Sequence, residues 1–138
     1  MERFASEGHA HIPVGASAVY GTDPPTSGPH YDGVARPGFY RDRAPAPGFL
    51  VHNLEHGHVV IYYDPQRLAP EGMAYLEELT QRHQGTWDAV LAVPRPDPEY
   101  VLILTAWQHR QRLRGFERAA VDAFVDRFRG RGPENPVR

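Results

Sequence analysis

The sequence predicts an α+β fold, an α/β sandwich in which a small mixed sheet carries helices on one face. Two observations predict this class. The back of the chain alternates short apolar runs with amphipathic stripes, in the order β-α-β-β-α. The front is rich in proline and glycine, with 7 of the 14 prolines and 7 of the 13 glycines, and these residues favour turns and extended segments. We therefore expect one domain over residues 1–138, with an irregular Pro/Gly-rich N-terminal wrap (1–50) around a core (51–131).

Each core element has a local pattern. Residues 58–63 alternate as a strand should, and Asp64-Pro65 ends that strand. Ala69-Pro70-Glu71 opens a helix that Gly85 closes, with proline in the first turn. Apolar runs predict further strands over 87–93 and 100–107. A stripe from Phe116 to Phe128 predicts the final helix.

Composition narrows the kinds of partner. The chain is 41% apolar, has a formal charge of −2 and contains no cysteine, so a metal site would need nitrogen and oxygen ligands. Acids interleave with the arginine run at 110, 112, 114 and 118, which predicts a solvated helix face rather than a nucleic-acid or membrane surface. No apolar stretch approaches the ~20 residues of a membrane span, and no signal peptide follows Met1. We expect a soluble chain without membrane insertion; the oligomeric state, a homo-oligomer included, stays open.

The densest signal is a histidine cluster ahead of the first strand: His52, Glu55, His56 and His58. If residues 52–56 form a helical turn, His52 and His56 share a face and can hold one ion. If the strand begins at His56, then His56 and His58 share a side instead. Because Gly57 separates the helical turn from the strand that follows, we favour His52 and His56 as partners, with His58 on the strand's outer face. Glu55 would be a ligand, a support for an imidazole or a general base.

A rigid front loop supplies the next candidate. Residues 23–31 contain three prolines, which restrict the backbone of the loop that carries His30. This loop therefore loses little conformational entropy when His30 binds a ligand. His30 would be the third nitrogen that a metal site needs. His11, spaced with His9 on one side of an extended segment, is an outside candidate. The alternative for the whole set is a hydrogen-bonded polar cluster without an ion.

His52-x-x-Glu55-His56 also has the H-x-x-E-H order of inverted zinc metallopeptidases. That chemistry needs the motif within a sustained helix and a carboxylate ligand from another helix. Pro47-Gly48 and Gly57 leave room for hardly two turns, so the sequence argues against a peptidase.

Five motifs together resemble the bacterial domain-of-unknown-function family numbered 3105: Glu7-Gly8 before His11, the segment PPTSGPHY (24–31), VHNLEHG (51–57), Tyr63-Asp64-Pro65 and Ala106-Trp107. The resemblance implies a small α/β domain, commonly outside the cytoplasm behind an N-terminal anchor, with no settled activity. Its two long motifs fall on His30, His52, Glu55 and His56. This sequence departs from the family pattern in having no anchor or signal segment.

Three functions are open at this stage. The first is a domain that stores, delivers or senses one divalent transition-metal ion, copper or zinc. Its ligands would be His30, His52, His56 and Glu55, and His11 is an outside candidate. The second is a hydrolase or lyase with Glu55 or His56 as base and Tyr31, Phe39, Tyr40 and Phe49 as pocket wall. The third is a non-catalytic interaction domain with a structural polar cluster.

Overall fold

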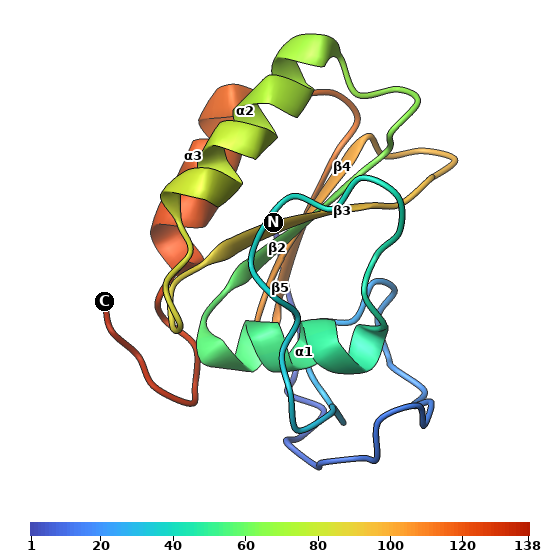
Figure 1. The fold of residues 1–138 in the computed structure, drawn as a ribbon, viewed down its shortest axis with the longest axis vertical. Helices are drawn as coiled ribbons and strands as arrows, with labels where there is room; N and C mark the ends of the chain where they lie inside the picture. Colours follow the sequence, from blue (N-terminus) through green and yellow to red (C-terminus); the bar gives the residue numbers. More distant parts are fainter.

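The computed structural model describes residues 1–138 and contains a five-stranded mixed sheet with three helices (Figure 1). The sheet order is β1-β5-β4-β2-β3, and only β2 and β3 run parallel. The strands span Glu2–Arg3 (β1), Val59–Tyr63 (β2), Val90–Pro94 (β3), Leu102–Ala106 (β4) and His109–Leu113 (β5).

The helices lie on both faces of the sheet (Figure 1). The two predicted helices, α2 (Pro70–Arg82) and α3 (Arg118–Phe128), pack against the residues of β2 that point to one side, such as Ile61. A third helix, α1 (Pro47–His56), packs against the alternate residues, such as Val60. Successive strand residues face opposite sides, so β2, which is buried along its whole length, contributes to two cores.

The α+β class is confirmed, and the predicted strands and both predicted helices are present with shifted ends. The two predicted helices share one face as expected, but α1 covers the other face, so the helices do not all lie on one side. Three elements were not predicted from the sequence, namely α1 as a full helix and the strands β1 and β5. The interpretation of the arginine run as a helix face is wrong. Arg110 and Arg112 lie in β5, and only Arg118 belongs to α3.

Strand β5 pairs with β4 over five residues, and Arg110 joins its other edge to β1. The side chain of Arg110 is buried, and its guanidinium donates to both carboxylate oxygens of Glu2 at 2.8 and 3.0 Å. Glu2 lies in β1, which pairs antiparallel with β5 at the sheet edge. A contact between the two ends of the chain therefore defines this edge.

The Pro/Gly-rich front wraps around the α1 side of the sheet (Figure 1). Ala35 is buried in the core beneath α1, and Tyr20, Tyr40 and Ala44 pack against that core. Single backbone bridges join residue 11 to residue 30 and residue 39 to residue 92. This wrap brings histidines of the front segment next to α1. None of the three helices combines the length and the apolarity needed to cross a bilayer.

Candidate metal centre

Helix α1 positions His52, Glu55 and His56. It spans ten residues, so the expectation of hardly two turns is wrong. Pro47 occupies the first turn, where its missing N–H costs nothing, and Gly57 ends the helix in a left-handed conformation at φ 105°. The preferred helical-turn arrangement is therefore confirmed, and His52 and His56 lie on one face with ring centroids 4.8 Å apart.

The rigid front loop sets His30 against this helix. Ser27 is fully buried, and its hydroxyl accepts the backbone N–H of Glu7 at 2.8 Å. The N–H of Tyr31 donates to the carbonyl of Gly48 at 3.0 Å. A Cβ at Gly48 would lie 2.6 Å from the Tyr31 ring, so only glycine lets the loop approach the helix this closely. The predicted convergence of His30 with His52 follows, with ring centroids 4.8 Å apart.

Three imidazoles use the same ring nitrogen to bond the backbone. The Nδ1 atoms of His30, His52 and His56 lie 2.8, 2.7 and 3.0 Å from the backbone carbonyls of Gly28, Tyr31 and Thr86. A carbonyl only accepts, so each Nδ1 carries the proton and donates it. In the neutral rings each Nε2 is then a bare acceptor, the form in which imidazole ligates a metal.

These Nε2 atoms alternate with carboxylate oxygens in what we call the histidine–carboxylate row: His30, Glu55, His52, Glu134, His56. The consecutive separations along it are 3.3, 3.9, 3.6 and 3.3 Å. Two ligand atoms bound tetrahedrally to one zinc ion lie about 3.4 Å apart. Two overlapping triplets have ligand atoms within 4.8 Å of one another: His30, His52 and Glu55 (the inner group), and His52, His56 and Glu134 (the outer group).

The clearest anomaly is at His30. Its Nε2 is buried without a hydrogen-bond partner, although Glu55 Oε1 lies 3.3 Å away. In the neutral ring this is one acceptor facing another, which is unfavourable in a buried setting. Only a cation between the two atoms, a proton or a metal ion, turns the pair into an attractive one.

Glu55 is suited to be an anionic ligand. Burial raises its pKa, but the hydrogen bond from His9 and the charge on His30 act against burial, and the pKa is lowered overall. His9 Nδ1 lies 2.6 Å from Glu55 Oε2, which leaves Oε1 to face His30 and His52. The His9 ring itself stacks on Trp107 at 4.9 Å.

Sequence reasoning missed Glu134. The C-terminal segment returns to the end of α1, where the N–H of Glu134 donates to the carbonyl of Glu55 at 3.2 Å. Gly132 makes this approach possible, because a Cβ there would lie 2.5 Å from that same carbonyl oxygen. No local signal marks Glu134 in the sequence, since only this long-range contact gives it a place in the row.

Two other histidines differ in their placement. His11 lies near the row, with its ring 5.0 Å from that of His30, but belongs to neither triplet; its Nδ1 is 3.2 Å from Asp32. The expectation that His58 faces outward is wrong. His58 is buried, receives a hydrogen bond from Asn53 at Nδ1 and donates from Nε2 to the Thr86 carbonyl at 2.7 Å.

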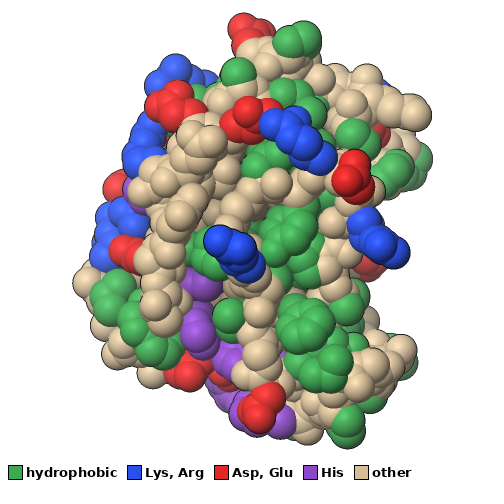
Figure 2. Space-filling model, in the orientation of Figure 1, with side chains coloured by type: hydrophobic (Ala, Val, Ile, Leu, Met, Phe, Trp, Pro, Cys, Tyr) green, Lys and Arg blue, Asp and Glu red, His purple; other side chains and the backbone are tan.

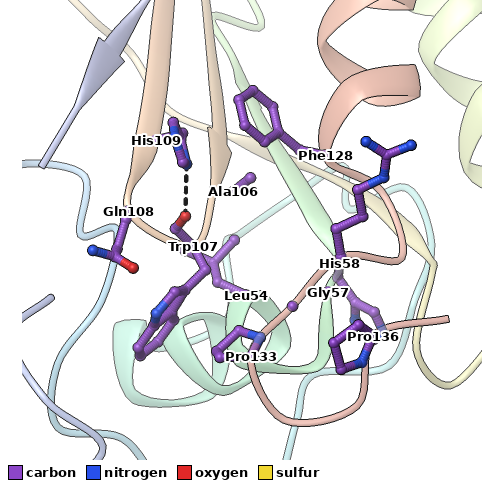
Figure 3. Close-up of a pocket in the computed structure, with 12 residues that line it drawn as sticks. Leu54, Gly57, His58, Ala106, Trp107, Gln108, His109, Phe128, Pro133 and Pro136 are labelled. Atoms are coloured by element: carbon purple, nitrogen blue, oxygen red, sulfur yellow. Dashed lines mark hydrogen bonds between the residues drawn. The ribbon is translucent and has the colours of Figure 1, made fainter. Parts of the chain in front are cut away.

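The surroundings of the row offer no shared substrate wall. Figure 2 shows histidine side chains gathered with carboxylates toward the lower end of the molecule. A neighbouring cavity of about 250 Å³ is lined by Leu54, His58, Trp107 and Phe128, but by no member of the row (Figure 3). The four aromatics expected to form one wall are divided between the two sheet faces: Phe39 packs on the α2/α3 core, and Tyr40 and Phe49 on the α1 core.

The metallopeptidase pattern is likewise incomplete. His52, Glu55 and His56 do share a helix, yet the other members of the row come from the front loop and the C-terminal segment. No second helix provides the further carboxylate that this chemistry requires.

The fold and the row define a small α+β protein with a histidine-rich cluster that could hold a metal ion. The family model described as "Protein of unknown function (DUF3105)" matches residues 11–138, nearly the whole chain. The chain belongs to this family. No curated protein and no solved structure matches it.

Proposed function

We propose that this protein binds one divalent transition-metal ion, copper or zinc, through the Nε2 atoms of His30 and His52 and the carboxylate of Glu55. The supporting observation is the buried Nε2 of His30, which faces Glu55 Oε1 at 3.3 Å without a hydrogen-bond partner. A bound ion replaces this contact between acceptors with two favourable bonds. The ligand set, nitrogen and oxygen without sulfur, suits both metals.

Storage, delivery or sensing of the ion agrees best with the surroundings. A catalytic metal keeps an open position beside a substrate pocket. The cavity next to the row contains none of its ligand groups. Three protein ligands leave further coordination positions, which His11 or water would fill. The extracytoplasmic location implied by the family resemblance would suit a protein that meets metal ions before they reach the cytoplasm.

Metal analysis tests this proposal directly. The purified protein should bind one zinc or copper ion per chain at equilibrium. Glu55→Gln keeps the shape of the side chain and removes its charge, and should weaken binding by more than about tenfold, since even residues that only orient a ligand contribute that much. His83→Ala is the matched control, because His83 lies at the end of α2, outside the row.

Two results would contradict the proposal. Equal affinity in Glu55→Gln and in the unsubstituted protein would place the ion elsewhere. A protein that takes up neither metal would leave the row as a network of imidazolium and carboxylate groups, which is the interaction-domain alternative. Circular dichroism of each variant separates loss of binding from loss of fold.

A further inference from the structure

The outer group does not merely repeat the inner one, because the two triplets share a ligand. His52 belongs to both, and its Nδ1 is already bound to the carbonyl of Tyr31 at 2.7 Å. A single Nε2 lone pair binds one ion at a time. Full occupation of one triplet therefore excludes full occupation of the other.

The side chains of the outer group are more exposed than those of the inner group. The exposed fraction is 38% at Glu134, 13% at His56, 9% at His52, 10% at Glu55 and 0% at His30. The outer group therefore meets solvent at Glu134, whereas the inner group ends in a fully buried imidazole. A hydrated ion meets the carboxylate of Glu134 first, and it loses water in steps as protein ligands replace it.

We infer that His52, His56 and Glu134 form a transient outer position through which a divalent transition-metal ion reaches the inner position of His30, His52 and Glu55. This inference rests on the proposed function. The ion moves by ligand exchange around His52, whose Nε2 lies 3.6 Å from Glu134 Oε2 and 3.9 Å from Glu55 Oε1. The bond to His52 is kept while the Glu134 and His56 bonds give way to those of Glu55 and His30. No change of charge or oxidation state is involved.

Geometry gives each position a separate optical reporter. The chain has two tryptophans. The Trp87 ring lies 4.4 Å from the ring of His56, in the outer group. The Trp107 ring stacks on His9, which hydrogen-bonds to Glu55 of the inner group. Copper(II) quenches nearby indole fluorescence, so the two rings can report on the two positions.

Rapid mixing of copper(II) with the single-tryptophan variants Trp107→Phe and Trp87→Phe tests the order of events. In Trp107→Phe, the remaining Trp87 should quench in a fast phase whose rate rises with copper concentration. In Trp87→Phe, the remaining Trp107 should quench later, in a phase that becomes independent of copper concentration. Simultaneous quenching, or quenching of Trp107 first, would overturn the inference.

Glu134→Gln tests the role of the outer carboxylate. Its backbone contact with Glu55 remains, so the fold of the C-terminal segment should persist. Uptake and release should both slow by about tenfold, because the charge that attracts the ion is lost. The dissociation constant should change by less than about threefold, since Glu134 contributes to the path rather than to the final position. Glu71→Gln, on the exposed first turn of α2, is the matched control.

Four outcomes would overturn the inference. Unchanged rates in Glu134→Gln would exclude the outer path. A dissociation constant that rises as much as the uptake rate falls would make Glu134 a ligand of the final site. Slower uptake in His11→Ala, with normal uptake in Glu134→Gln, would place the access route on the N-terminal side. Two ions bound per chain would contradict the shared use of His52. Absence of any bound ion would overturn the proposed function as well, whereas the first three outcomes leave that function standing.

Discussion

At the scale of single residues, a buried hydrogen-bond network fixes the orientation of His56. The carbonyl of Thr86 accepts N–H groups from both His56 Nδ1 and His58 Nε2. The amide of Asn53 completes the network, because it donates to His58 Nδ1 at 2.9 Å and exchanges two hydrogen bonds with the backbone of Ala35. His58 is thus a support for the row and not a member of it.

The stability of the metal-free protein should depend on pH through His58. Burial lowers the pKa of His58 to about 4, from an ordinary value near 6.5. The unfolded chain therefore binds this proton more readily than the folded one. The contribution of His58 to the free energy of unfolding is about 3 kcal/mol above pH 6.5. This contribution declines as pH falls toward 4. Urea unfolding at pH 7, 5.5 and 4 measures it.

His58→Gln is the control for this pH dependence. Glutamine offers one acceptor for Asn53 and one donor for Thr86, but it does not titrate. The variant should therefore lose less stability than the unsubstituted protein between pH 7 and 4. The same slope in both proteins would assign the pH dependence to other groups.

Metal occupancy should fall at acidic pH for a related reason. Binding requires the bare Nε2 atoms of His30 and His52, and protons compete for these atoms. Occupancy is therefore expected to decline as the solution becomes acidic. Equilibrium dialysis across pH 8 to 4 measures this. Occupancy that stays constant down to pH 4 would argue against ligation by histidine.

At the scale of elements, the end of α1 is the junction on which the row depends. Gly57 adopts φ 105°, and a Cβ there would lie 2.6 Å from the carbonyl oxygen of Trp87. The carbonyl of Gly57 also accepts the N–H of Gly130 at 2.9 Å, which anchors the C-terminal segment. A side chain at this position would disturb both the helix end and the segment that carries Glu134.

Gly57→Ala should therefore lower the free energy of unfolding by at least about 2 kcal/mol, since it combines backbone strain with a steric clash. Chemical denaturation measures the loss. Gly115→Ala is the matched control, because nothing lies within 4 Å of a Cβ at Gly115. Its effect should stay within about 0.5 kcal/mol. Equal effects in the two variants would contradict the role assigned to Gly57.

Elements with an apolar period could be predicted from the sequence, and those without one could not. Apolar periodicity predicted helices α2 and α3 and strands β2 to β4. Helix α1 lacks such a period, because seven of its ten residues are buried and its polar ones face the wrap. Strand β5 pairs with β4 in an antiparallel hairpin, but its polar sequence from His109 to Leu113 carries no apolar strand pattern.

A similar division holds for the candidate site. Residue type and loop rigidity were enough to select His30, His52, Glu55 and His56. The backbone carbonyls that orient the imidazoles could not be predicted, because residues such as Thr86 carry no side-chain signal for that contact. Glu134 was missed for the same reason, since its backbone contact with Glu55 spans distant parts of the chain.

At the scale of the whole molecule, three separate segments meet at the row. The front loop supplies His30, α1 supplies three members, and the C-terminal segment supplies Glu134. The sheet supports this arrangement by burying α1 against β2. Unfolding must separate these segments, so the unfolded chain cannot keep the same set of ligands together.

A metal ion should therefore stabilise the folded protein in proportion to its binding. With free metal at 100 times the dissociation constant, the free energy of unfolding should rise by about 2.7 kcal/mol. Thermal unfolding with and without zinc measures the shift, which should fall to about 1.4 kcal/mol or less in Glu55→Gln at the same zinc concentration and persist in His83→Ala. An equal shift in Glu55→Gln would mean that zinc binds away from the row. Because a ligand stabilises only the state that it prefers, this measurement tests the convergence of the three segments as one property of the fold.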